Sequence, residues 1–245
     1  MYNRSVFFLP LRDENPSYGL PIVVLLLIAI NVYAFYLEIT FSGGMEAAVF
    51  TWGAIPKELV TFRDFPPATG LPVYLNIFTS MFMHGGLMHL IGNMWFLWLF
   101  GDNCEYVMGR LGFAGFYLLC GIAATIAQVV LSPLSDVPMV GASGAIAGVM
   151  GAYLVYYPAA RIYSLMWLFV FVRFVYIPAA LFLIVWIVFQ IWSAMGDQLT
   201  GGGIAYGAHI GGFAAGLLLA KAFMARKSPP RGKHYGWTRR IYDFD

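Results

Sequence analysis

Two residues in glycine-rich surroundings carry the side chains that nucleophilic catalysis needs. Ser143 lies in a Gly-Ala-Ser-Gly run, and His209 lies in an Ala-His-Ile-Gly-Gly run. A serine hydroxyl attacks a carbonyl carbon when a nearby base accepts its proton, and histidine is the most common such base. The alternative for Ser143 is structural. Gly141, Gly144 and Gly148 surround it at three- and four-residue spacings, which is typical of closely packed membrane helices whose serines bond backbone carbonyls.

A third group of polar side chains is formed by His84, His89 and Asn93. His89 and Asn93 are four residues apart, so they share one face of a helix. Attack on a carbonyl places negative charge on its oxygen, and hydrogen-bond donors aimed at that oxygen stabilise the transition state. The histidine and asparagine types at this spacing can supply such donors to a reaction at Ser143.

The composition indicates the medium in which these residues work. Of the 245 residues, 60% are hydrophobic and only 11% are charged. Soluble domains contain about 25% charged residues, which they need to cover a surface that faces water. The composition therefore argues against a soluble enzyme, a disordered chain and a nucleic-acid-binding protein, and it indicates an integral membrane protein.

The charged residues divide the chain into long apolar segments. A helix needs about 20 apolar residues to cross the hydrocarbon core, and its backbone must be hydrogen-bonded within the segment. We predict an all-α fold with six spans near residues 19–39, 84–101, 112–131, 143–157, 176–193 and 205–224. The hydrophobic stretch 161–175 is bracketed by Arg161 and Arg173, so it is predicted to be an interfacial hairpin rather than a seventh span.

The distribution of positive charge predicts the orientation. Lys and Arg gather on the cytoplasmic side of membrane proteins. With the N-terminus inside, all 14 Lys and Arg residues except Lys57 and Arg63 fall on the inner side. The prediction is one domain: a cytoplasmic N-terminal segment over 1–18, a six-helix membrane domain over 19–224, and a basic cytoplasmic tail over 225–245.

This topology brings the three chemical groups to one depth. The spans that contain Ser143, His209 and the His89/Asn93 pair all begin on the outer side, so all four residues are predicted to lie in the outer layer of the membrane. Asp136 lies in an outer loop, where its carboxylate can orient His209. Asp197 lies in another outer loop and can do the same.

In order and spacing, these motifs resemble the rhomboid intramembrane serine proteases, of the compact bacterial six-span type. The resemblance is carried by His84-x4-His89-x3-Asn93, Gly101-x3-Glu105, Gly141-x-Ser143-Gly144 and Ala208-His209-x2-Gly212. It implies a Ser143/His209 dyad that works through an acyl-enzyme. It also implies an oxyanion hole formed by His89, Asn93 and the backbone N–H of Ser143.

The resemblance has further implications for substrate and location. The substrates are expected to be transmembrane segments of other membrane proteins, with no metal, cofactor or nucleic acid taking part. The expected location is the bacterial cytoplasmic membrane, with the active site open to the external side. The glycines of the stretch 194–203 permit unusual backbone angles, so this stretch is expected to be a mobile lid over the site, with a plain flexible connector as the alternative. The fifth span, with Trp186 and Trp192, is expected to border the lateral access path of the substrate.

Two positions depart from the family pattern. Leu75-Asn76 stands where many members have a Trp-Arg pair in the first outer loop. Ala147 stands where several bacterial relatives have a tyrosine that stacks on the catalytic imidazole, so the motifs name no residue that orients His209.

Two other classes of function are alternatives. One is a catalytically silent rhomboid-like protein that binds membrane clients. The other is a transporter, or a haem- or metal-binding protein, lined by His84, His89 and His209. Glu38, at the end of the first span, is expected to be an interfacial residue.

Overall fold

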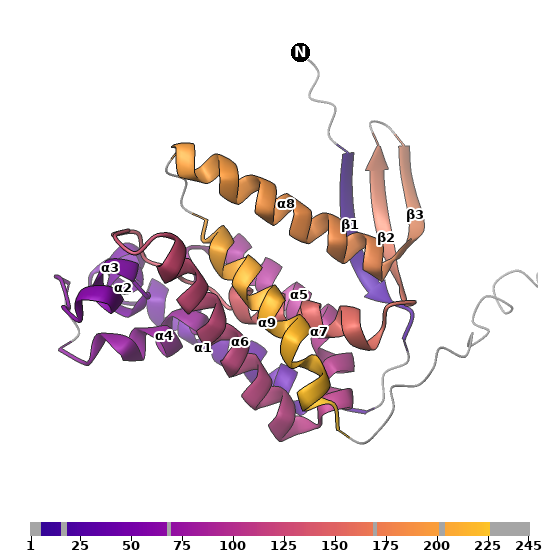
Figure 1. Cartoon of the computed structure of the whole chain (residues 1–245), viewed down its shortest axis with the longest axis horizontal. Helices are drawn as coiled ribbons and strands as arrows, with labels where there is room; N and C mark the ends of the chain where they lie inside the picture. Colours follow the sequence, from indigo (N-terminus) through magenta and orange to yellow (C-terminus); the bar gives the residue numbers. More distant parts are fainter. Residues whose placement is uncertain (1–5, 16–18, 68–69, 169–170, 201–203, 226–245) are drawn as a thin grey trace, which may run out of the picture.

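Helices make up most of the chain, and a small sheet lies at one side of them (Figure 1). The computed structural model describes residues 6–15, 19–67, 70–168, 171–200 and 204–225. The helices are α1 (Ile22–Ile39), α2 (Gly44–Trp52), α3 (Pro56–Thr61), α4 (Asn76–Thr79), α5 (Leu87–Met108), α6 (Arg110–Leu131), α7 (Ser143–Tyr156), α8 (Ala179–Thr200) and α9 (Tyr206–Phe223). Two short 3-10 turns, η1 (Val73–Leu75) and η2 (Ser80–Phe82), flank α4.

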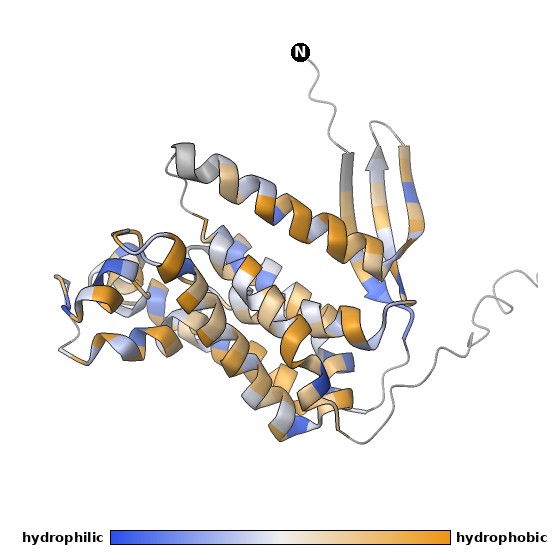
Figure 2. Ribbon diagram, in the orientation of Figure 1, coloured by the Kyte–Doolittle hydropathy of each residue, from blue (hydrophilic) through white to orange (hydrophobic). Residues whose placement is uncertain are grey.

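Each of the six predicted spans overlaps one helix of 14 to 22 residues, namely α1, α5, α6, α7, α8 or α9, although α5 and α8 extend several residues beyond the predicted ends. By length and composition, residues 22–39, 110–131 and 179–196 are apolar enough to cross a membrane, and α7 is a shorter apolar helix. Figure 2 shows that α8 is hydrophobic along most of its length. Large apolar side chains such as Leu26 on α1 and Trp192 on α8 are exposed, as suits contact with lipid.

The prediction of an all-α fold is wrong at the segment between α7 and α8. Strands β1 (Val6–Asp13), β2 (Arg161–Leu168) and β3 (Phe171–Pro178) form an antiparallel sheet in that order. The strands are rich in β-branched and aromatic residues, which favour sheets and pair across them. For example, the rings of Tyr163 and Phe174 stack with centroids 5.3 Å apart. The predicted hairpin is thus the β2–β3 hairpin, and β1 comes from the segment predicted to be a simple N-terminal tail.

The predicted lid over 194–203 is also largely wrong. Helix α8 continues to Thr200, because this stretch contains good helix formers and a single interrupting glycine, Gly196. Residues 201–203 of the predicted lid lie outside the described residues, as do residues 226–245 of the predicted basic tail.

The centre of the molecule is α7, which packs against α5, α6 and α9. Its contact with α9 is made through glycines. A Cβ atom at Gly212 would overlap the carbonyl oxygen of Gly144, and one at Gly216 would overlap that of Gly148. The two backbones are therefore in direct contact, as small residues at four-residue spacing allow.

Buried acidic groups hold the other elements against this centre. Glu105 of α5 accepts hydrogen bonds from the N–H groups of Val23 (3.1 Å) and Val24 (2.9 Å). These are orphan donors of the first turn of α1, so the carboxylate both satisfies them and complements the helix dipole. This explains the glutamate of the Gly101-x3-Glu105 motif. A Cβ at Gly101 would lie 2.9 Å from the Val24 side chain, so the glycine lets α1 approach.

The sheet is tied to the helices by Asp13, the last residue of β1. Its Oδ2 accepts hydrogen bonds from the Tyr153 hydroxyl on α7 (2.6 Å), from Asn103 on α5 (2.9 Å) and from Asn15 (2.8 Å). Next to it, Glu14 forms an ion pair with Arg161 of β2 at 2.9 Å. One residue therefore links the sheet to two central helices.

We predict that Gly216→Ala destabilises the protein. The new methyl group would force α7 and α9 apart, and overpacking of this kind lowers the free energy of unfolding by about 1–3 kcal/mol. Gly92→Ala in α5 is the matched control, because a Cβ there meets nothing within 4 Å. Thermal unfolding in detergent should show a lower Tm for Gly216→Ala and an equal or higher one for Gly92→Ala. Equal Tm values for the two variants would contradict the close contact.

We also predict that Asp13 makes stability depend on pH. Burial raises the pKa of Asp13 from 3.8 to about 7, opposed by the hydrogen bond from Tyr153 and reinforced by nearby Asp102. Between these pH values the folded protein holds a proton that the unfolded chain releases, so stability falls as pH rises through this window.

The measurement is the Tm of wild type and Asp13→Asn between pH 4 and pH 8. The wild type should lose stability relative to the variant as pH rises from 4 to 7, with no further relative change above that. Parallel curves across the range would show that Asp13 does not carry this proton.

Candidate active site

Ser143 and His209 lie in hydrogen-bond contact. Ser143 is the first residue of α7, and His209 lies in the first turn of α9. Ser143 Oγ is 2.9 Å from His209 Nε2. The glycine contact between α7 and α9 brings the two helix starts together, so these two predicted site residues meet because their backbones touch.

The other ring nitrogen of His209 is held by a residue that the sequence motifs do not include. His209 Nδ1 lies 2.7 Å from Oε1 of Gln190, which belongs to α8 and is 7% exposed. Trp186, one helical turn earlier on α8, packs on the same imidazole with ring centroids 5.9 Å apart. A glutamine in the middle of an apolar span is a signal for a buried polar contact, since such a group must find a partner.

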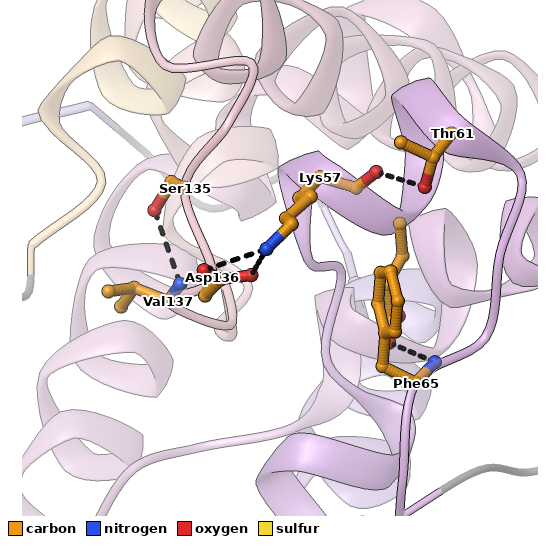
Figure 3. Close-up of polar contacts among 7 residues, drawn as sticks. Lys57, Thr61, Phe65, Ser135, Asp136 and Val137 are labelled. Atoms are coloured by element: carbon orange, nitrogen blue, oxygen red, sulfur yellow. Dashed lines mark hydrogen bonds and ion pairs between the residues drawn. The ribbon is translucent and has the colours of Figure 1, made fainter.

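Of the two acidic residues expected to orient His209, Asp136 has a different partner. It forms an ion pair with Lys57 at 2.9 Å, on the loop between α6 and α7 (Figure 3). The side chain of Asp197 lies outside the described part of the chain.

His89 and Asn93 lie beside the turn that leads into Ser143. Gly141, two residues before the serine, has a φ of +119°, which a residue with a side chain rarely adopts. A Cβ atom at Gly141 would lie 2.8 Å from His89 Nε2 and 3.3 Å from Asn93 Nδ2. Asn93 is buried, and its Nδ2 has no hydrogen-bond partner among the described residues. The structure therefore leaves an unused donor next to the serine turn.

His84 is a supporting residue rather than a neighbour of the reactive pair. Its ring lies edge-on to that of His89, with centroids 5.2 Å apart. Its backbone N–H donates to both carboxylate oxygens of Glu38 on α1, at 2.9 and 3.1 Å. Glu38, the residue expected at the membrane interface, is 1% exposed: its carboxylate is buried within the protein, where it holds the loop that leads into α5.

The loop that precedes Ser143 is clamped by the segment between α1 and α5. Ala54 and Met139 exchange two backbone hydrogen bonds of 3.0 and 2.9 Å. The Gly141 N–H donates to the carbonyl of Ser80 at 2.9 Å. Figure 3 shows one part of this clamp, where Lys57 of α3 contacts Asp136.

The segment itself is fixed by polar side chains near the Leu75-Asn76 departure. Thr79 Oγ1 donates to the carbonyl of Trp52 at 2.6 Å, and buried Asn76 approaches the carbonyl of Thr51 at 3.5 Å. These contacts fix the segment between α1 and α5, which contains the Leu75-Asn76 departure.

A small cavity lies beside the serine. It has a volume of about 30 Å³ and is lined by Ser80, Thr125, Gly141 and Ser143 among others. A cavity of this size holds a water molecule, since about 10–15 Å³ suffices. Within the described residues, no three His, Cys, Asp or Glu side chains gather closely enough to hold a metal ion.

Comparison with known proteins gives a consistent family. The Rhomboid domain family model matches residues 72–226. Rhomboid protein 1, mitochondrial, of Saccharomyces cerevisiae is 30% identical over 189 residues, which cover 71% of this chain and 50% of that protein. The putative rhomboid protease YdcA of Bacillus subtilis is 32% identical over 124 residues, or 49% of this chain and 62% of that protein.

A third relative, the rhomboid protease GluP of Bacillus subtilis, is 32% identical over 137 residues, which cover 56% of this chain and 25% of that protein. The chain thus spans between a quarter and about three fifths of the length of these relatives. The family model covers more than half of the chain, including every residue of the candidate site except Glu38 and the clamp segment before α4. This chain belongs to the rhomboid family.

Proposed function

We propose that this chain is an intramembrane serine endopeptidase that cleaves transmembrane segments of other membrane proteins. The observation that carries the proposal is the 2.9 Å contact between Ser143 Oγ and His209 Nε2 at two helix starts. Membership of a family that includes proteins named as proteases supports the same interpretation.

In the first half of the proposed reaction, His209 Nε2 accepts the hydroxyl proton of Ser143 while Oγ attacks the peptide carbonyl. The negative carbonyl oxygen accepts hydrogen bonds from Asn93 Nδ2, from the His89 ring and from the backbone N–H of Ser143. The last of these is an orphan donor, because the first N–H groups of a helix have no partner within it. The C–N bond then breaks as His209 protonates the leaving amine, which leaves an acyl-enzyme on Ser143.

In the second half, a water molecule attacks the acyl-enzyme while His209 Nε2 takes a proton from it. The ester bond breaks, and the proton passes to Ser143 Oγ, which restores the starting state. The cavity beside Ser143 is a place from which water can reach this bond.

The proposed setting is a membrane crossed six times, with both termini on the cytoplasmic side and the helix starts of α7 and α9 toward the external side. The six long helices at the predicted spans and the bias of Lys and Arg support this topology. A bacterial cytoplasmic membrane is the proposed location, in keeping with the two relatives from Bacillus subtilis. Substrate is proposed to enter beside α8.

We predict that a fluorophosphonate probe labels the purified protein once, at Ser143. Ser143→Ala removes the nucleophile and His209→Ala removes the base, so neither variant should gain the adduct mass or cleave a model transmembrane substrate. Ser135→Ala is the matched control, because the Ser135 hydroxyl only accepts the N–H of Val137 in an outer loop (Figure 3). Intact mass spectrometry and gel analysis of the substrate give the result.

The result that would overturn the proposal is a folded wild type that neither reacts with the probe nor cleaves the substrate. Such a protein would instead be tested for capture of intact membrane clients, the function expected of a catalytically silent member.

We further predict that Gly141→Ala lowers kcat about 10- to 100-fold, because its methyl group shifts the His89 and Asn93 donors without removing them. Complete removal of one such donor lowers kcat about 10²–10³-fold. Gly44→Ala is the control, since Gly44 also has a positive φ (+80°) but a Cβ there meets nothing within 4 Å. Cleavage kinetics that change equally in the two variants would assign the effect to backbone strain alone.

A further inference from the structure

The contact between Gln190 and His209 defines which ring nitrogen carries the proton. Gln190 Oε1 lies 2.7 Å from His209 Nδ1, and a carbonyl oxygen can only accept a hydrogen bond. Nδ1 must therefore bear the hydrogen. A neutral imidazole has one N–H, so Nε2 is left with a free lone pair directed at Ser143 Oγ, 2.9 Å away. This is the tautomer in which histidine can accept the serine proton.

We propose that Gln190 is the positioning residue of this active site, acting through His209 and not on the substrate. The proposal rests on the proposed serine-protease function. Ala147 has no ring to stack on the imidazole. Tyr206 of α9 lies edge-on to the imidazole, with ring centroids 6.4 Å apart, and α8 supplies two further contacts. Trp186 packs on the ring, and Gln190, four residues later on the same helix face, holds Nδ1.

The energetic reason lies in the burial of the pair. Gln190 is 7% exposed, so its carbonyl has little access to water. If the proton moved from Nδ1 to Nε2, two acceptors would face each other at 2.7 Å, and the hydrogen bond would be lost. Gln190 therefore disfavours the tautomer that cannot act as a base.

Because Gln190 lies on α8, the packing of α8 against α9 determines the tautomer of His209. Helix α8 supplies no atom to the reacting bonds, yet the base is correctly prepared only while α8 packs against α9. Elsewhere on α8, apolar side chains such as Val188 and Trp192 are exposed. The face that carries Gln190 is the one through which α8 contacts the site.

The test compares three variants in the full-length protein. Gln190→Leu removes the acceptor at similar volume, and the loss should appear as a kcat about 10- to 100-fold lower with KM within about twofold. Gln190→Glu keeps an acceptor oxygen at the same place and should restore most of the activity. Gln128→Leu is the matched control, because half-buried Gln128 accepts the backbone N–H of Ala208 (3.2 Å) rather than a proton of the imidazole.

A second readout does not depend on activity. The 15N spectrum of histidine-labelled protein, with His209→Ala as the subtraction reference, reports the tautomer of His209. Wild type and Gln190→Glu should show the proton on Nδ1, and Gln190→Leu a mixture of both tautomers. Gln190→Met replaces the leucine variant if that variant has a lower Tm than wild type.

The two readouts separate the possible failures. A wild-type kcat in Gln190→Leu, or a lower kcat with the tautomer unchanged, would overturn the positioning role. An inactive wild type whose tautomer still responds to Gln190→Leu would overturn the protease proposal and leave the role of Gln190 in place.

Discussion

The backbone contact between α7 and α9 is the constraint on which the rest of the structure depends. Glycines face glycines there, and a Cβ at Gly212 or Gly216 would overlap a carbonyl oxygen of α7. Lipid offers no hydrophobic force to press two apolar helices together, so close packing of this kind is what joins them. The same contact places the starts of both helices at one depth, and the hydroxyl and imidazole that these starts carry come within hydrogen-bond distance.

Around this contact, buried polar groups act as connectors between elements. Glu105 caps α1, Glu38 holds the loop before α5, and Asp13 joins the sheet to α5 and α7. Each carboxyl group accepts hydrogen bonds from a different element, as a buried polar group must in order to be stable. Asn93 differs from these connectors, because its Nδ2 lies against the serine turn without a partner among the described residues. The connectors have their hydrogen-bond partners within the fold, whereas Asn93 Nδ2 has none, which fits its proposed role as an oxyanion donor.

The position of Gln190 links this framework to the proposed chemistry. The proposed nucleophile and base lie on α7 and α9, which the glycine contact holds together. Gln190, the proposed positioning residue, lies on α8, which is less buried. A change in how α8 packs against α7 and α9 would therefore alter the orientation of His209 and, through it, the proposed reaction.

The sequence by itself determined the long helices, the family, and the residue types at the site. Each long helix is an apolar stretch whose backbone must be hydrogen-bonded locally, so its existence depends only on neighbouring residues. The motif spacings likewise placed His89 with Asn93 on one face and Ser143 and His209 at helix starts. Local rules sufficed for these features because each is contained within one element.

Only the tertiary structure decided the sheet, the buried role of Glu38 and the partner of His209. Val6–Asp13 becomes a strand because it pairs with Arg161–Leu168, a segment far along the chain, and no local spacing encodes that pairing. Gln190 meets His209 because α8 turns one particular face toward α9. Gln190 in an apolar helix signals a buried polar contact, but a single polar residue does not specify which neighbouring helix it faces, so the packing between helices decides the partner.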